Sequence, residues 1–344
     1  MTFIKENVPF KNLTTFKIGG NARYLAEVRN KEELRAAVSF AKEKGLPIFI
    51  LGGGSDILIS DSDFNGVVIR YVGDGVSFEE KDGEVLVVGE AGIDWDKFVK
   101  LSVEKNLQGI ECLSGIPGTV GASPIQNIGA YGQELKDTFV SLTAYDIREG
   151  KFVNFNKEDC QFSYRESIFK KPEVRGRYLI TDITLKLRKD SKPVVRYESL
   201  KTFLKEKNIN NPSLSDLREA VLELRGQKLV DPSVIGNAGS FFKNPIVGKD
   251  TVLKLQKSYP HIPFFEINGD KVKVYAGWLI EHAGWKGKRY KNTGVSDKNA
   301  LVITNPEGKA TAKEVMELAV KISRDVYKKF GVRLEPEVQY ITFN

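Results

Sequence analysis

The chain contains the stretch Pro47-Ile-Phe-Ile-Leu-Gly-Gly-Gly54, a short apolar run that ends in three consecutive glycines. Such a run is typical of a buried strand, because both faces of the strand are apolar. Glycine lets the chain turn sharply, and it lets backbone N–H groups approach an anionic ligand without a Cβ in the way. The stretch therefore predicts a buried strand that enters a tight glycine turn.

Strand and helix patterns alternate on both sides of this stretch. We expect a strand over 23–28 and, after it, a helix that begins at the cap residue Asn30. The helix should end near Gly45, and another strand is expected over 66–71. The first part of the chain is therefore predicted to contain a βαβ unit.

Farther along, the pattern changes to a second lobe of mixed helices and strands. The expected elements are strands over 84–88 and 178–187, helices over 94–106 and 213–227, and a last helix from the capping box of Thr311 and Glu314 to Gly331. The polar segment 205–212 ends at a proline and is the predicted linker.

Length and composition indicate how many domains to expect and which classes of protein to exclude. A chain of 344 residues exceeds what one hydrophobic core usually organises, so two or three domains are expected. Hydrophobic residues make up 41% and charged residues 28%, which is typical of a folded globular protein. The net charge is +7, but the basic stretch 286–291 lacks the extended run and the regularly interleaved aromatic residues of a nucleic-acid groove, and anion steering is an alternative role for it. We interpret it as a solvated loop and expect no nucleic-acid partner.

The sequence lacks several patterns that would indicate a membrane, a secreted or a metal-binding protein. No segment approaches the roughly 18 apolar residues of a membrane span, and residues 1–6 lack a signal-peptide pattern, so a cytoplasmic protein without a membrane partner is expected. Two cysteines and two histidines do not give the spacing of a disulfide framework or a zinc site. We therefore expect no metal.

Glycine turns at 18–20, 51–56 and 115–121 indicate an anionic ligand. None matches a Rossmann fingerprint or a P-loop. Taken singly, each turn can equally be only a tight turn, but together they favour a dinucleotide phosphate. The longer stretch 115–132 predicts an irregular wall that lies flat against an aromatic ring system, with a buried loop as the alternative.

Three polar residues stand in unusual apolar settings. Arg165 lies within 162–169, Ser240 lies between a glycine and two phenylalanines, and Glu337 follows a proline. Taken one by one, an ion pair or a cap explains each of them. If they converge, the apolar surroundings strengthen their electrostatic effect and favour catalysis.

Seven blocks run along essentially the whole chain. They are 15–20, 51–55, 115–122 together with 126–132, 164–165, 239–245, 276–280 and 334–338. In this order they resemble the UDP-N-acetylenolpyruvoylglucosamine reductase family, and Tyr197 in Arg196-Tyr-Glu-Ser199 resembles the tyrosine loop of its longer subclass.

The resemblance implies an α+β chain with a vanillyl-alcohol-oxidase/PCMH-type FAD-binding fold of two lobes and a C-terminal α+β substrate-binding domain. The implied domains are lobe 1 over 1–75, with 331–344 returning to it, lobe 2 over 76–205 and the substrate domain over 212–330. FAD is expected to be bound non-covalently. The protein is expected to be a monomer.

The resemblance also implies an activity. NADPH-dependent, FAD-mediated reduction would convert UDP-N-acetylglucosamine enolpyruvate to UDP-N-acetylmuramate, in peptidoglycan precursor biosynthesis. Hydride addition to this enol ether places enolate charge beside the substrate carboxylate. The implied roles are stabilisation of that charge by Arg165 and Glu337 and proton donation by Ser240.

The resemblance further assigns ligands residue by residue. The cofactor-binding residues are Ile18, Gly19, Gly20, Gly52, Gly53, Gly54, Ser55, Gly115, Gly118, Gly121, Ala122 and Ile128. The substrate-binding residues are Tyr197, Lys243, Asn244 and His282. The sequence departs from the family pattern at Asp56, Val230 and His282.

Two other functions compete with this interpretation. An FAD-dependent oxidase of the same fold would oxidise an alcohol and pass electrons to oxygen. Many such enzymes tether the flavin through a histidine, and no histidine precedes His261. A non-catalytic nucleotide-sugar binding protein would explain the glycines and the positive charge, but it gives no reason for Arg165, Ser240 and Glu337 together.

Overall fold

The computed structural model describes residues 3–81, 83–189 and 193–343. The chain forms two compact units, each assembled from separate segments. The first unit comprises Met1–Val8, Ala22–Gly53 and Phe64–Arg225, and the second comprises Pro9–Asn21, Gly54–Asp63 and Gly226–Asn344. The sequence predicted three domains, with boundaries near 75 and 205. The division into two units is coarser than that and does not test these boundaries, so they remain a prediction.

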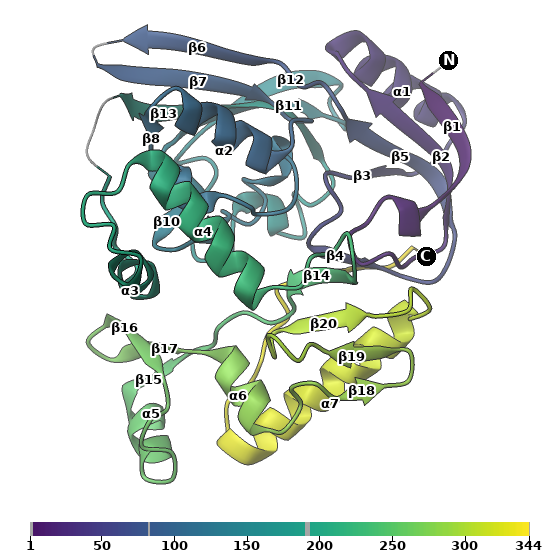
Figure 1. The fold of residues 1–344 in the computed structure, drawn as a ribbon. Coiled ribbons are helices and arrows are strands. Elements are labelled where there is room, and N and C mark those ends of the chain that lie inside the picture. Colours follow the sequence, from purple (N-terminus) through teal and green to yellow (C-terminus); the bar gives the residue numbers. More distant parts are fainter. Residues whose placement is uncertain (1–2, 82, 190–192, 344) are drawn as a thin grey trace. The chain divides into compact units, whose positions relative to one another are not determined.

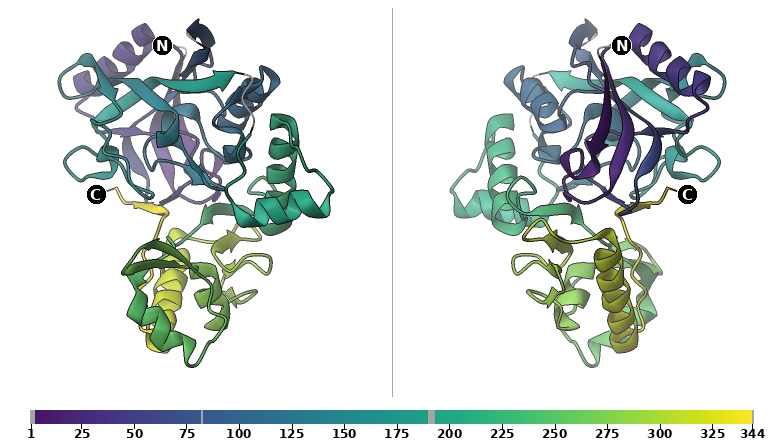
Figure 2. Two further views of the ribbon diagram at one scale, coloured as in Figure 1. Left: turned by 90° about the vertical axis from the view of Figure 1, so that its left-hand side faces the viewer. Right: turned by 90° about the vertical axis from the view of Figure 1, so that its right-hand side faces the viewer.

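The first unit begins with a small sheet of order β1-β2-β5-β3, formed by β1 (Ile4–Pro9), β2 (Asn21–Val28), β5 (Phe64–Tyr71) and β3 (Ile48–Ile50). β5 pairs in parallel with both β2 and β3, and α1 (Lys31–Glu43) buries its apolar face against this sheet (Figures 1 and 2). Asn30 accepts a hydrogen bond from the Glu33 N–H at 2.8 Å and caps the helix. The predicted βαβ unit is confirmed.

The larger sheet of the first unit is antiparallel. Its order is β12-β11-β13-β7-β6, with β8 beside β13, formed by β12 (Lys151–Asn156), β11 (Phe139–Asp146), β13 (Tyr178–Lys189), β7 (Glu84–Glu90), β6 (Val76–Lys81) and β8 (Leu107–Gln108). Between β7 and β8 lies α2 (Trp95–Glu104), whose buried residues Trp95, Phe98 and Val99 belong to the core under this sheet. The predicted strands and helix are confirmed.

The glycine-rich stretch between these strands has little regular structure. It contains single 3-10 turns at Glu111–Leu113, Val120–Ala122 and Leu135–Asp137 and a two-residue hairpin of β9 (Gly129–Ala130) and β10 (Gln133–Glu134). The sequence predicted such an irregular segment, because its glycines and prolines interrupt both helix and strand patterns.

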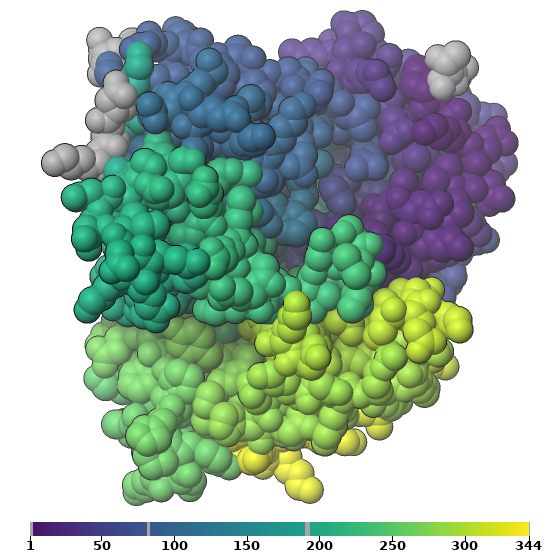
Figure 3. Space-filling view, in the orientation of Figure 1, coloured from purple at the N-terminus to yellow at the C-terminus, as the bar shows by residue number. Residues whose placement is uncertain are grey.

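Two helices complete the first unit. α3 (Glu198–Glu206) and α4 (Leu214–Lys228) share a small core that includes Leu204, Leu217 and the free cysteine Cys112. Figure 3 shows the surface of these two helices, in teal and green, next to the blue surface of the segment that includes α2. The predicted linker 205–212 thus mostly joins two helices, and the division between the units falls inside α4, after Arg225.

The second unit contains further sheets and a long helix. One sheet has the order β14-β20-β19-β18, formed by β14 (Gly236–Ser240), β20 (Val302–Asn305), β19 (Thr293–Val295) and β18 (Arg289–Tyr290). A second sheet has the order β15-β17-β16, formed by β15 (Ile246–Gly248), β17 (Lys271–Val274) and β16 (Phe264–Asn268). The helices are α5 (Lys249–Gln256), α6 (Ala276–His282) and α7 (Ala312–Phe330).

The ends of α7 agree with the sequence prediction. Thr311 and Glu314 form a capping box, and Gly331 ends the helix with φ 67°. After it, β21 (Gln339–Ile341) pairs in parallel with β4 (Ile57–Ile59), so the last strand returns to an early part of the chain. Within the described ranges, no helix combines the length and the apolar character needed to cross a bilayer.

Candidate functional site

Two of the predicted glycine turns meet in the first unit. A Cβ built on Gly53 would lie 2.7 Å from the Gly118 Cα, and one built on Gly52 would lie 3.0 Å from the Ala122 Cβ. Only glycine permits such a close approach of two backbones. The structure therefore brings together four residues that the resemblance assigns to the cofactor.

The rest of this segment is anchored to the sheet. Gly121 donates its N–H to the Ala91 carbonyl at 3.0 Å, and a Cβ on Gly121 would lie 2.5 Å from the Ala91 Cβ. Ile128 is 7% exposed and belongs to the core. Packing alone thus accounts for Gly121 and Ile128, so any contact they make with a cofactor is an additional role.

Gly115 also lies in the first unit, but the other predicted cofactor residues lie in the second unit, because the boundary between the units falls between Gly53 and Gly54. A Cβ on Gly54 would overlap the Leu13 carbonyl, and one on Gly20 would lie 2.6 Å from the Ser62 backbone. Gly19 has φ 127°, which favours glycine. Ile18 is 3% exposed and buried in the core, and Ser55 directly follows these close contacts.

The first unit offers features that fit FAD. Closely packed glycine backbones leave no side chains between peptide groups and a phosphate. In the same segment, the Oε1 atom of Gln126 is buried, and no group in the described part of the chain donates a hydrogen bond to it. A bound ligand with an N–H group would satisfy this acceptor. The sequence prediction did not include Gln126, although an amide in an apolar, glycine-rich stretch is a signal for it.

Arg165 lies at the tip of a tight hairpin. Ser163 and Glu166 form an isolated antiparallel bridge, and Arg165 between them has φ 56°. Its guanidinium donates from Nη2 to the Gly129 carbonyl at 2.8 Å, and its own carbonyl accepts from the Lys170 Nζ at 3.1 Å. The first bond holds the side chain of Arg165 against the glycine-rich segment, and the second holds its backbone within the hairpin region.

Asn127 ties this hairpin to the same segment. It is 0% exposed, and its Nδ2 donates to the Ser163 carbonyl at 3.1 Å and to the Glu134 Oε2 at 2.8 Å. Its Oδ1 accepts from the Lys136 N–H at 3.0 Å. The sequence prediction missed Asn127 and Lys170, because their partners are distant in sequence or are backbone atoms.

Ser240 and Glu337 lie on adjacent segments of the second unit. Ser240 ends β14 opposite Val302, just after a β-bulge at 237–240. The next residue, Phe241, accepts a hydrogen bond from the Glu337 N–H at 2.8 Å. The structure therefore brings together two of the three predicted catalytic residues, while Arg165 belongs to the other unit.

The bulge before Ser240 is fixed by a buried amide. Asn237 is 2% exposed, and its Oδ1 accepts from the Gly239 N–H at 2.9 Å. Its Nδ2 donates to the Val230 carbonyl at 3.1 Å and to the Ile235 carbonyl at 2.8 Å. Val230 departs from the family pattern. It helps to hold the bulge only through its backbone carbonyl, so this contact does not depend on its side chain.

The predicted substrate-binding residues have well-defined surroundings. Tyr197, in the first unit, precedes α3 and packs its ring edge-on against Tyr131 at 5.5 Å. In the second unit, Lys243 pairs with Glu335 at 2.7 Å, and the Asn244 Oδ1 accepts from the Ala276 N–H at 2.9 Å. These contacts fix the positions of the three side chains.

His282 has a local structural role. Its ring stacks on Trp278 at 3.7 Å, one turn earlier in α6, and its Nδ1 lies 3.0 Å from the Trp278 carbonyl. Helix packing therefore accounts for this histidine without a ligand.

The basic stretch 286–291 is partly neutralised by acidic residues. The ion pairs are Lys286 with Glu281 at 3.0 Å, Arg289 with Glu307 at 3.3 Å and Lys291 with Glu317 at 2.6 Å. This agrees with a surface loop.

Comparisons with known proteins cover nearly the whole chain. The model of an FAD binding domain matches residues 22–156, and that of the UDP-N-acetylenolpyruvoylglucosamine reductase C-terminal domain matches 231–341. A UDP-N-acetylenolpyruvoylglucosamine reductase of Pseudomonas aeruginosa is 42% identical over 97% of this chain and 98% of its own length. That of Flavobacterium johnsoniae is 41% identical over 98% and 99%.

A solved structure is similar over the same extent. The UDP-N-acetylenolpyruvylglucosamine reductase (MurB) of Thermus caldophilus superposes with a TM-score of 0.67 at 26% identity, covering 98% of this chain and 99% of that one. With the FAD-binding-domain match, it confirms the expected α+β fold class and FAD as the cofactor. The chain belongs to the UDP-N-acetylenolpyruvoylglucosamine reductase family.

Proposed function

We propose that the protein uses FAD and NADPH to reduce UDP-N-acetylglucosamine enolpyruvate to UDP-N-acetylmuramate, a step of peptidoglycan precursor synthesis. The observation that carries the proposal is the extent of the likeness, which reaches 42% identity over 97% of the chain with a reductase of this name. Both competing interpretations explain only part of the chain, whereas this one accounts for the FAD-binding part and the C-terminal part together.

The glycine turns are assigned to the cofactor. Gly52 and Gly53, where they meet Gly118 and Ala122, would place backbone N–H groups near the FAD diphosphate. Ile18 to Gly20, Gly54 and Ser55 are assigned to the same ligand on the second unit. We add Gln126 to the residues assigned to FAD, because no group in the described part of the chain donates a hydrogen bond to its buried Oε1 atom.

FAD held at this site, once reduced by NADPH, would supply the hydride that adds to the enol ether. The protein must then stabilise negative charge beside the substrate carboxylate. Arg165 suits this task, because the bond to Gly129 holds its guanidinium and the bond from Lys170 holds its backbone before the charge develops. A preorganised charge of this kind lowers the barrier without reorganisation during the reaction.

Ser240 is assigned the proton transfer that completes the reduction. A serine hydroxyl is a weak acid in water, so its activity depends on neighbouring hydrogen bonds and charges. Glu337, on the adjacent segment, is the assigned partner in stabilising the enolate. Tyr197, Lys243 and Asn244 are assigned to the UDP part of the substrate, and His282 joins them only by resemblance.

Anaerobic mixing tests the proposal. The purified yellow protein should bleach with NADPH and regain its colour with the enolpyruvyl nucleotide. Recolouring by oxygen but not by that nucleotide would favour the oxidase. A protein purified without colour would favour the nucleotide-sugar binding protein. Cytoplasmic location, the monomeric state and the choice of NADPH over NADH remain predictions.

A further inference from the structure

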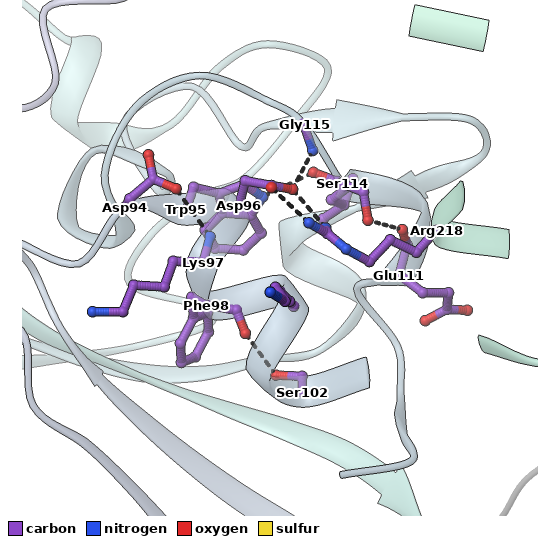
Figure 4. A network of polar contacts seen from close by, with 12 residues as sticks. Asp94, Trp95, Asp96, Lys97, Phe98, Ser102, Glu111, Ser114, Gly115 and Arg218 are labelled. Carbon is purple, nitrogen blue, oxygen red and sulfur yellow. Dashed lines mark hydrogen bonds and ion pairs between the residues drawn. The ribbon is translucent and has the colours of Figure 1, made fainter. Parts of the chain in front are cut away.

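Asp96 lies in the first turn of α2 and bonds to two distant parts of the first unit. Its carboxylate pairs with both terminal nitrogens of Arg218 in α4, with Oδ1–Nη1 and Oδ2–Nη2 distances of 2.6 Å each. Figure 4 shows this carboxylate between the Arg218 guanidinium and the backbone of Gly115. A bidentate pair of charged groups is among the strongest hydrogen-bonded contacts in proteins.

The same carboxylate holds the start of a cofactor turn. The Gly115 N–H donates to the Asp96 Oδ1 at 2.6 Å. On the other side of this residue, the Gly115 carbonyl accepts from the Arg225 Nε at 3.1 Å. Gly115 is therefore held from both sides by charged groups, Asp96 of α2 and Arg225 of α4.

Packing reinforces these bonds. Gly115 has φ 71°, and a Cβ on it would lie 2.8 Å from the Leu222 Cδ2 and 3.1 Å from the Arg225 Nε. α4 therefore lies directly against this glycine. Because Leu217 and Leu224 also fix α4 in the core that it shares with α3, the helix is a firm base for the turn.

The charge state of Asp96 strengthens its contact with Arg218. Burial tends to raise the pKa of Asp96, but the hydrogen bonds from Arg218 and Gly115 outweigh it and hold this pKa below its usual value. The carboxylate is therefore ionised at neutral pH. The Arg218 side chain is only 12% exposed, so solvent screens the pair less than a surface pair.

We propose that Asp96 and Arg218 are positioning residues for FAD. They fix Gly115, and through it the 115–121 turn, so that Gly118 meets Gly53 at the correct place. The inference rests on the assignment of these glycines to FAD. It explains why an acidic residue of α2 bonds to an arginine far along the chain.

A second ion pair of the first unit provides a matched control. Asp146 is 1% exposed and accepts from the Arg177 Nε at 2.9 Å and Nη2 at 2.6 Å. It also accepts from the backbone N–H groups of Arg148 and Glu149, at the end of β11. This pair has similar chemistry, but within the described part of the chain the carboxylate of Asp146 bonds to Arg148, Glu149 and Arg177 and not to the glycine turns.

The experiment measures FAD release from the holoprotein on serial dilution, read as free-flavin fluorescence, together with Tm. Asp96→Ala should raise the FAD dissociation constant about 10–100-fold, because the turn is no longer held ready for FAD and its ordering must then be offset by the binding energy. Asp96→Asn keeps an acceptor for the Gly115 N–H and should show a smaller rise. Asp146→Ala should lower Tm without changing the dissociation constant.

Two results would overturn the inference. One is an unchanged dissociation constant in Asp96→Ala. The other is an equal rise in Asp96→Ala and Asp146→Ala at matched loss of Tm, which would mean that the pair is only structural. If Asp96→Ala does not fold, the FAD dissociation constant and Tm of Asp96→Asn and Arg218→Lys are compared with those of Asp146→Ala in the same way. A failure of the proposed function is separate, since FAD would then be held by wild type without reduction of the enolpyruvyl nucleotide.

Discussion

The hairpin of Arg165 and the end of β14 hold two proposed catalytic side chains in different ways. Arg165 has a left-handed backbone, and it depends on hydrogen bonds from its own guanidinium and from Lys170. Ser240 lies at the end of a strand whose neighbours are held by backbone bonds, such as those of Phe241 to Leu301 and Glu337.

This difference predicts different tolerance to substitution. A residue held by backbone bonds keeps its place when neighbouring side chains change. A residue held by side chains moves when one of its supports is removed. We therefore expect changes near Ser240 to act only when they remove a reacting group, whereas changes around Arg165 should act at a distance.

Ser240→Ala should have the largest effect. The strand remains paired, but the proton donor is lost, and a positioned general acid contributes about 10²–10⁴-fold in rate. Steady-state turnover should fall by that factor while FAD stays bound. Ser233→Ala, at an exposed serine of the same unit, should leave turnover unchanged. A fall in flavin content in Ser240→Ala would show that the serine is structural.

Arg165→Ala should lower turnover by about 10²–10³-fold, the usual cost of losing a group that stabilises transition-state charge. FAD content should stay near that of the wild type. Arg175→Ala removes an exposed arginine from the same region and serves as the control. Loss of flavin with Arg165→Ala would instead mean that the arginine maintains the glycine-rich segment.

Glu337→Gln should lower turnover by about 10²-fold, because the ionisable carboxyl group is removed while the side chain keeps its size. The bond from its N–H to Phe241 involves only backbone atoms and should persist. Glu307→Gln is the comparison, since this exposed carboxylate of the same unit pairs with Arg289, to which no role is assigned. Equal turnover losses in both variants would argue against a specific role for Glu337.

Tyr197→Phe keeps the ring that packs against Tyr131 and removes only the hydroxyl group. A hydrogen bond to a charged group contributes roughly 1.5–3 kcal/mol, so binding of the enolpyruvyl nucleotide should weaken by about 10–100-fold. Binding of NADPH should weaken less. Titration of flavin absorbance with each ligand measures both constants, and equal weakening would contradict the assignment.

Lys170→Met should have the smallest effect and tests the comparison itself. It removes the bond to the Arg165 carbonyl but leaves the guanidinium intact, so turnover should fall by about 3–10-fold. Lys171→Met, at an exposed neighbour, should have no effect on turnover. If Lys170→Met lowers Tm without changing turnover, side-chain support of the hairpin does not matter for the reaction.

Local patterns predicted much of the fold. Asn30 and the Thr311–Glu314 capping box marked helix starts correctly, because a cap depends on residues within one turn. Local patterns did not predict the parallel pairing of β21 with β4, since it depends on segments at opposite ends of the chain, and only the resemblance implied that 331–344 returns to the first part of the chain.

The candidate site was predicted less completely. The sequence pointed to Gly121 as a ligand, yet its contact with Ala91 already requires glycine there. Asp96 gave no signal, because an acidic residue in a first helical turn is common, and its partner Arg218 lies far along the chain. Long-range side-chain bonds of this kind become visible only in the folded structure.

Stopped-flow absorbance on Ser240→Ala tests the central claim most directly, because the two half-reactions place different demands on this residue. NADPH should bleach the bound flavin at nearly the wild-type rate, since that step needs no proton donor. Recolouring by the enolpyruvyl nucleotide should be about 10²–10⁴-fold slower, and Ser240→Cys should recover part of that rate. Recolouring as fast as in the wild type, or a slowed NADPH step alone, would contradict the proposed role of Ser240.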